Sequence, residues 1–165
     1  MKGLPRSLAH AGNASSPAGS KTLRLNGTIS VADGAPGFGT VVIGDFPEGN
    51  IGFRSAVAYL QLTTADADVT ATFDGDFSIG TTPTADNALA GTEVNIIPST
   101  ALGAATAKVS PTVRAVNTTA AVFDNTDGSL EINLNLLIDD AAISGAADFT
   151  FTGVLYLDYT VMGDD

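Results

Sequence analysis

The glycines in the stretch ADGAPGFGTVVIGDFPEGNI, residues 32–51, are the first residues whose spacing could do chemistry. Gly34 and Gly39 have the separation of the two glycines of a phosphate-binding loop, in which backbone N–H groups cradle phosphate oxygens. Thr40 stands where such a loop needs a lysine, and no helix-forming segment follows it. Glycines also serve turns and positive φ angles, so we predict a turn–strand–turn unit around residues 41–43.

Acidic residues in short groups are the second possibility, because carboxylates can bind a cation. The groups are Asp74 with Asp76, Asp139 with Asp140, and the turn Asp124–Gly128. Calcium takes six to eight oxygen ligands, and the pattern of the twelve-residue calcium loop is not present. Asp and Asn favour turns for backbone reasons alone, so we predict turns and no metal site.

Groups that could catalyse a reaction are scarce in this sequence. There is no cysteine, and the only histidine is His10. Glycosidase chemistry needs two carboxylates across a cleft, usually with aromatic residues that stack on sugars. Tryptophan is absent, and Glu48, Glu93 and Glu131 stand in no recognisable context. We therefore predict that the protein is not an enzyme and binds no cofactor.

Charge is divided along the chain. Residues 1–32 carry four basic residues and no acid, whereas residues 33–165 carry three basic residues and all eighteen acids, so +4 and −15 make the net charge of −11. An acidic body repels nucleic acid and anionic membrane surfaces, and we expect neither as a partner. No apolar stretch approaches the roughly 20 residues of a membrane span. The first residues lack the apolar region of a secretory signal, so we expect synthesis in the cytoplasm.

Period-two alternation of apolar and polar residues predicts β-strands. The longer alternating segments are residues 23–31, 69–79, 130–138 and 149–161. Residues 56–62 are apolar on both faces, which predicts a central strand. The shorter candidate strands are residues 40–43, 93–97, 112–116 and 119–123. Turn signals such as Asp33-Gly34 and Asp127-Gly128 separate them, and only residues 101–108 look helical. We predict an all-β, antiparallel sandwich of eight or nine strands over residues 23–165.

Within the last predicted strand, two groups of aromatic residues should face opposite ways. Phe149, Phe151 and Tyr159 share one face and are expected in the core, while Tyr156 lies on the other face with Val154. An apolar spot on an outer face hints at a subunit contact.

The basic N-terminal segment, residues 1–22, is predicted to be an extended or flexible arm. It is rich in Gly, Pro, Ser and Ala, a composition that is also typical of termini without any partner. The charge division favours docking on an acidic surface, such as that of a neighbouring copy. The residues expected to bind a partner are Lys2, Leu4, Arg6, Leu8, Lys21 and Arg24.

The segment NGTISVADGAPGFGTVVIGDFPEGNI, with the Ala-, Thr- and Gly-rich strands after it, resembles capsid cement or decoration proteins of tailed bacteriophages. The resemblance covers about a sixth of the chain and includes no diagnostic catalytic or binding motif. It implies a jelly-roll-like β-sandwich that binds the major capsid protein on the outer surface of the virion and stabilises the shell. It also implies a homo-oligomer, most often a trimer.

An alternative stays open at this point: a receptor- or glycan-binding β-sandwich of a phage fibre or a bacterial surface protein. Such a module should have exposed aromatic residues and a groove. A tail-tube subunit is a weaker alternative, because the sequence has neither the long loop nor the helix that such a subunit needs.

Overall fold

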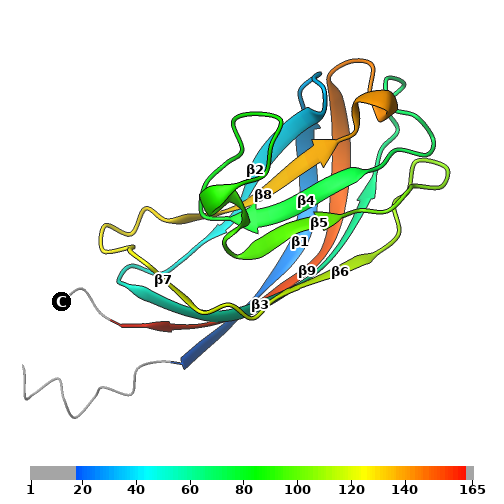
Figure 1. Ribbon diagram of the computed structural model, residues 1–165. Helices are drawn as coiled ribbons and strands as arrows, with labels where there is room; N and C mark the ends of the chain where they lie inside the picture. The colour runs from blue at the N-terminus through cyan, green and yellow to red at the C-terminus, as the bar shows by residue number, and fades with distance from the viewer. Residues whose placement is uncertain (1–17, 163–165) are drawn as a thin grey trace, which may run out of the picture.

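Two antiparallel β-sheets packed face to face form the body of the protein, as the computed structural model in Figure 1 shows; residues 18–162 are described. The strands are β1 (Ala18–Val31), β2 (Gly37–Asp45), β3 (Ile51–Thr63), β4 (Gly75–Gly80), β5 (Ile97–Ala101), β6 (Val113–Asn117), β7 (Ala121–Phe123), β8 (Glu131–Ile138) and β9 (Ala147–Val161). Two single-turn 3₁₀ helices, η1 (Gly91–Val94) and η2 (Asp140–Ala142), lie between them. The prediction of an all-β antiparallel sandwich is confirmed.

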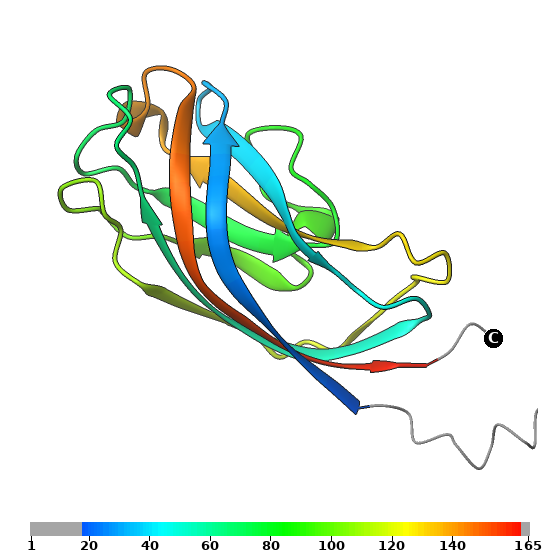
Figure 2. The same cartoon turned by 180° about the vertical axis from the view of Figure 1, so that it is seen from behind.

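Sheet A has the strand order β1–β9–β3–β6, and β7 also pairs with β3 beyond the end of β6. Sheet B has the order β2–β8–β4–β5. β1 pairs with β9 along all of its fourteen residues without a register shift. Figure 2 shows sheet A in front, with β1 in blue at its edge beside β9 in orange to red. The predicted central position of residues 56–62 is confirmed, because β3 lies between β9 and β6.

The core between the sheets is made by the apolar residues of each alternating strand. The rings of Phe73 and Phe149 meet edge to face with 5.2 Å between their centroids, and Phe46 meets Tyr159 edge to face at 5.6 Å. Phe149, Phe151 and Tyr159 are all buried, as predicted, while Tyr156 is exposed on the opposite side of β9. The alternation therefore assigned the two faces of β9 correctly.

Three local predictions are wrong. Residues 69–74 do not form a continuous strand: Val69 makes an isolated β-bridge to Ile143, residues 71–72 form a turn, and the strand begins only at Gly75. Residues 93–97 contain the last two residues of η1 and the first residue of β5, so they do not form one strand. Residues 101–108 are not helical, because after Ala101 the chain turns, with the positive φ angles of Ala107 and Lys108 (51° and 65°). Helix propensity in a short alanine-rich stretch is a weak signal that the tertiary contacts override here.

The predicted boundary between residues 22 and 23 falls inside β1. Residues 18–22 continue this strand and pair with residues 156–160 of β9. The described chain therefore begins and ends side by side, at the same end of the sandwich (Figures 1 and 2).

Candidate interaction surface

The outer face of sheet B is covered by the segment between β4 and β5, residues 81–96. Asn135 of β8 holds this cover: its side-chain oxygen accepts hydrogen bonds from Thr84 N and Thr40 Oγ1, both at 2.8 Å. Its Nδ2 donates to the carbonyl oxygens of Thr82 and Glu93, both at 3.1 Å. Asn133 and Asn135 are therefore buried on the polar side of an alternating strand. Sheet B is covered on both faces and offers little free surface along β8.

The outer face of sheet A is bare, and Figure 2 shows no ribbon in front of β1 and β9. Seven large hydrophobic residues of the described chain are exposed, and five of them belong to sheet A or follow its last strand: Tyr59, Val116, Val122, Tyr156 and Met162. Because they lie on neighbouring strands of one sheet, the exposed apolar area of this protein is concentrated on one face. Concentration of this kind is typical of interaction surfaces, whereas isolated exposed residues are not.

Two adjacent rows of side chains cross this face. In the first row, Tyr156 of β9 lies between Thr22 and Val57, and Val57 pairs with Val116. In the second, Val154 lies between Arg24 and Tyr59, and Tyr59 pairs with Arg114. We call the arginine, tyrosine and valine residues of these rows the arginine–tyrosine face: Arg24, Val57, Tyr59, Arg114, Val116, Val154 and Tyr156.

Positive charge brackets the apolar centre of this face. Arg114 at one edge donates through Nε to the hydroxyl of Tyr59 at 3.2 Å, which holds both side chains in place. Arg24 at the other edge makes no hydrogen bond or ion pair within residues 18–162. Tyrosine and arginine are the residues that most often carry binding energy in protein interfaces. The arrangement is thus suited to binding a protein surface with carboxylates around an apolar group.

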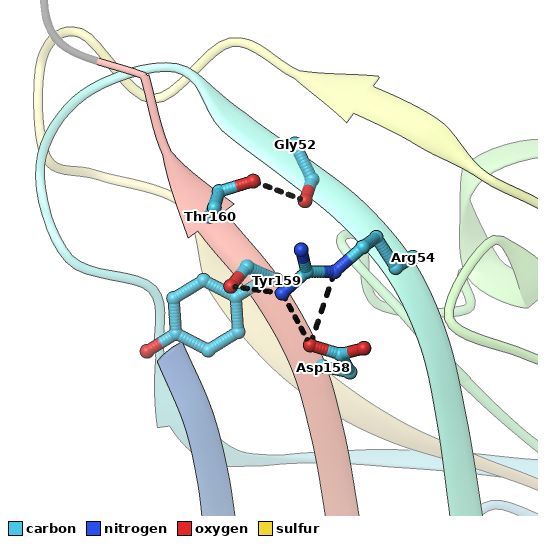
Figure 3. A network of polar contacts seen from close by, with 5 residues as sticks. All are labelled: Gly52, Arg54, Asp158, Tyr159 and Thr160. Atoms are coloured by element: carbon cyan, nitrogen blue, oxygen red, sulfur yellow. Dashed lines mark hydrogen bonds and ion pairs between the residues drawn. The ribbon is translucent and has the colours of Figure 1, made fainter. Parts of the chain in front are cut away.

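A third arginine belongs to the same side of sheet A, one step toward the chain ends (Figure 3). Arg54 donates from Nη2 to Asp158 Oδ1 at 2.6 Å and from Nε to the same oxygen at 3.1 Å. The two side chains are 46% and 48% exposed, so water screens this ion pair strongly. Beyond it lie Val122, 67% exposed, and Met162 beside Gly52. All three arginines of the described chain are therefore on the bare side of sheet A.

Most of the acidic residues gather at the two ends of the sandwich. One end, which we call the loop end, consists of the connections β1–β2, β3–β4, β5–β6 and β8–β9. Eight acids lie in these loops or at the strand starts beside them: Asp33, Asp66, Asp68, Asp74, Asp76, Asp139, Asp140 and Asp148. Partial burial, reinforced by the charges of Asp139 and Asp74, raises the pKa of the Asp76 carboxyl above its ordinary 3.8. At the opposite end, hydrogen bonds from the Ser129 hydroxyl and N–H lower the pKa of Asp127.

The partner-binding residues expected from the sequence fall into two groups. Lys2, Leu4, Arg6 and Leu8 lie outside the described residues. Lys21 and Arg24 both lie in β1, but on opposite sides of it: Lys21 donates from Nζ to the carbonyl oxygen of Asp45 at 2.5 Å, whereas Arg24 belongs to the outer face. The structure therefore does not bring these two residues into one site.

Sequence reasoning missed Tyr59, Arg54 and Arg114 as parts of a surface. Their alternation with buried residues of β3 and β6 was a usable sign that they point outward. Their proximity to Tyr156 depends on two pairings: that of β9 with β3, which connects residues about a hundred positions apart, and that of β3 with β6, in which Tyr59 and Arg114 are 55 positions apart.

The described residues were also compared with the requirements of metal binding and of membrane insertion. Residues 18–162 contain no set of three or more His, Cys, Asp or Glu side chains that could hold a metal ion. None of the helices in that range is long and apolar enough to cross a membrane. No protein-family model matches the chain, and no curated protein matches it.

Proposed function

We propose that this protein is a structural virion protein, a cement or decoration subunit that binds the outer surface of a capsid shell and stabilises it. The observation that carries the proposal is the bare arginine–tyrosine face on a protein whose other sheet is covered. A surface of arginines, tyrosines and valines, without a deep cleft, is suited to binding another protein.

The strand order supports a jelly-roll-like sandwich. β6 and β7 both pair with β3 and count as one interrupted strand, so eight strands remain. Strands 1, 9, 3 and 6 form one sheet, and strands 2, 8, 4 and 5 form the other. Jelly rolls of eight strands occur in viral capsid proteins and in lectins. Because one fold serves several functions, the strand order supports the virion role without deciding it.

The mechanism would be multivalent binding. The basic N-terminal segment, residues 1–17, continues from the start of β1 at Ala18 and carries Lys2 and Arg6. In an oligomer, several such segments would contact several capsid subunits at once, so weak contacts add to a strong attachment. Each decoration subunit would then bridge neighbouring major capsid subunits and resist their separation.

The test is co-sedimentation with expanded shells made of the major capsid protein encoded in the same genome. The full chain should sediment with the shells, and deletion of residues 1–17, which leaves β1 intact, should reduce binding at least tenfold. The double variant Lys2→Glu/Arg6→Glu should act like the deletion, with binding that weakens as salt screens the charges. Absence of binding by the full chain, or of any capsid gene beside it, would refute the proposal.

A second candidate function, glycan binding, is favoured by one observation. A shallow hollow of about 570 Å³ on the arginine–tyrosine face is lined by Thr22, Arg24, Asn26, Thr152, Val154 and Tyr156, among others. Tyr156, 48% exposed, could stack on a sugar ring while the hydroxyl, amide and guanidinium groups bind its hydroxyls. A glycan array distinguishes the two functions, since binding that Tyr156→Ala removes would favour the glycan module.

A further inference from the structure

The arginine–tyrosine face is positive in a protein that is otherwise acidic. Within residues 18–162 there are sixteen acids and five basic residues. The two crossing rows of the arginine–tyrosine face contain Arg24 and Arg114 and no acid. On the same side of sheet A, Asp158 is paired with Arg54, and most of the other acids lie at the two ends of the sandwich. The remaining surface of a second copy is therefore complementary in charge to this face.

We propose that the arginine–tyrosine face binds the acidic surface of a second copy of this protein, in a head-to-tail contact. The proposal deepens the proposed function, because it names the contact that would build the oligomer. It also stands without a capsid shell, since both surfaces belong to this chain.

Charge decides between head-to-tail and face-to-face contact. If two copies joined through the same face, Arg24 and Arg114 of one copy would meet positive charge on the other, and like charges brought together are unfavourable. A head-to-tail contact instead joins two different surfaces. Repeated around an axis, such contacts close into a ring when the rotation between copies allows it.

The loop end is the acidic surface with the most carboxylates, eight in all. Asp74, Asp76 and Asp139 lie near enough to one another to affect the pKa of Asp76. The one basic residue among these loops, Lys108, donates from Nζ to the carbonyl oxygen of Asp66. Arginines of a neighbouring copy would neutralise the negative charge of these carboxylates, which have few basic neighbours within the subunit.

A ring of this kind has a consequence for the N-terminal segments. Equivalent points of a closed ring lie at one level along its axis, so residues 1–17 of all copies would start from the same level. The ring would present the basic segments together, as multivalent binding to a shell requires.

The first test is the mass of the full chain in solution, by light scattering after size exclusion, over about 1–100 µM protein at low and at high salt. The parent should form an oligomer of defined size whose dissociation constant rises at least tenfold with salt. Arg24→Glu should make it a monomer at concentrations where the parent is assembled. The matched control is Lys21→Glu, which changes the charge equally in the same strand but lies off the face, and it should assemble within about threefold of the parent.

Mixing two variants tests the head-to-tail arrangement. Arg24→Glu/Arg114→Glu alters the face, and Asp68→Asn/Asp139→Asn/Asp140→Asn alters exposed side chains of the loop end. Each variant alone should be monomeric, but the mixture should form a one-to-one complex, because one intact face then meets one intact loop end and the ring cannot close.

Several results would overturn the inference. The first is a parent protein that stays monomeric at 0.1 mM and low salt, and the second is an oligomer that persists in Arg24→Glu/Arg114→Glu. The third is an equal loss of assembly in Lys21→Glu and Arg24→Glu, and the fourth is a mixture of the two variants that stays monomeric. Circular dichroism melting curves verify that each variant is folded. The shell-binding assay detects attachment by a monomer or by an oligomer formed on the shell, so failure here and failure of the proposed function are separate results.

Discussion

Asn135 and Asn133 make a matched pair for testing what holds the cover on sheet B. Both are buried on the same side of β8, two residues apart. Asn135 makes four hydrogen bonds, two of them at 2.8 Å and two at 3.1 Å. The Nδ2 of Asn133 is buried without a partner in the described chain. The same substitution, Asn→Leu, should therefore lower stability strongly at Asn135 and change it little at Asn133.

The magnitude follows from the groups that Asn135→Leu leaves behind. The N–H of Thr84 is buried and would lose its acceptor, at a cost of about 1–3 kcal/mol. The carbonyl of Glu93 keeps its bond from the Ser78 hydroxyl, and Thr40 and Thr82 are partly exposed and can turn to water. Their losses add about 1 kcal/mol together. We expect Asn135→Leu to lower the free energy of unfolding by about 3 kcal/mol, or the melting temperature by about 6–12 °C.

Asn133→Leu should change the free energy of unfolding by less than about 1 kcal/mol, because it removes a polar group that pays desolvation without a hydrogen bond in return. Urea denaturation with unchanged m-values measures both variants. Hydrogen exchange gives an independent readout, since the Thr84 amide should exchange faster in Asn135→Leu only. Equal stability changes in the two variants, or an unprotected Thr84 amide in the parent, would refute the role of Asn135.

Four further predictions concern the core, two carboxyl groups and a surface ion pair. Leu134→Asp should abolish cooperative unfolding at 25 °C, because it places an unpaired charge at a residue that is 1% exposed, and a parent-like melting curve would contradict the assigned core. The raised pKa of Asp76 means that protonation of this carboxyl favours folding, so stability is lost as the pH rises through that pKa. Asp76→Asn should therefore melt at a higher temperature than the parent at pH 7. The gain should vanish below pH 3.8, the ordinary pKa of an aspartate. Asp127, with its lowered pKa, has the opposite sign: Asp127→Asn should melt lower at pH 7, and the loss should disappear as the pH falls through the lowered pKa. A double-mutant cycle on Arg54 and Asp158 should give a coupling of about 0.2–1 kcal/mol that salt reduces, and a coupling above about 2 kcal/mol would show that the pair is less exposed than the structure has it.

The sequence by itself determined the class of fold and the two faces of its clearest strands. Alternation over residues 149–161 separates buried Phe149 and Phe151 from exposed Tyr156, because side chains of a strand point alternately to opposite faces. This signal is local, so it needs no knowledge of which strands pair. Local signals failed where tertiary contacts opposed them. The alanines of residues 101–108 favour a helix, but this segment forms a turn in the folded protein.

Only the tertiary structure decided what lies outside each sheet. Asn133 and Asn135 alternate with apolar residues and read as a solvent-facing row, yet both are buried, and residues 81–96 fold over Asn135 and bond to it. Arg24, Tyr59 and Arg114 read as unrelated polar positions, yet strand pairing across the chain places them around Val154. Period-two patterning encodes the direction of a side chain, whereas the neighbours of a sheet depend on strand order and on loop paths. These long-range choices made one face of this sandwich a covered layer and the other an open surface.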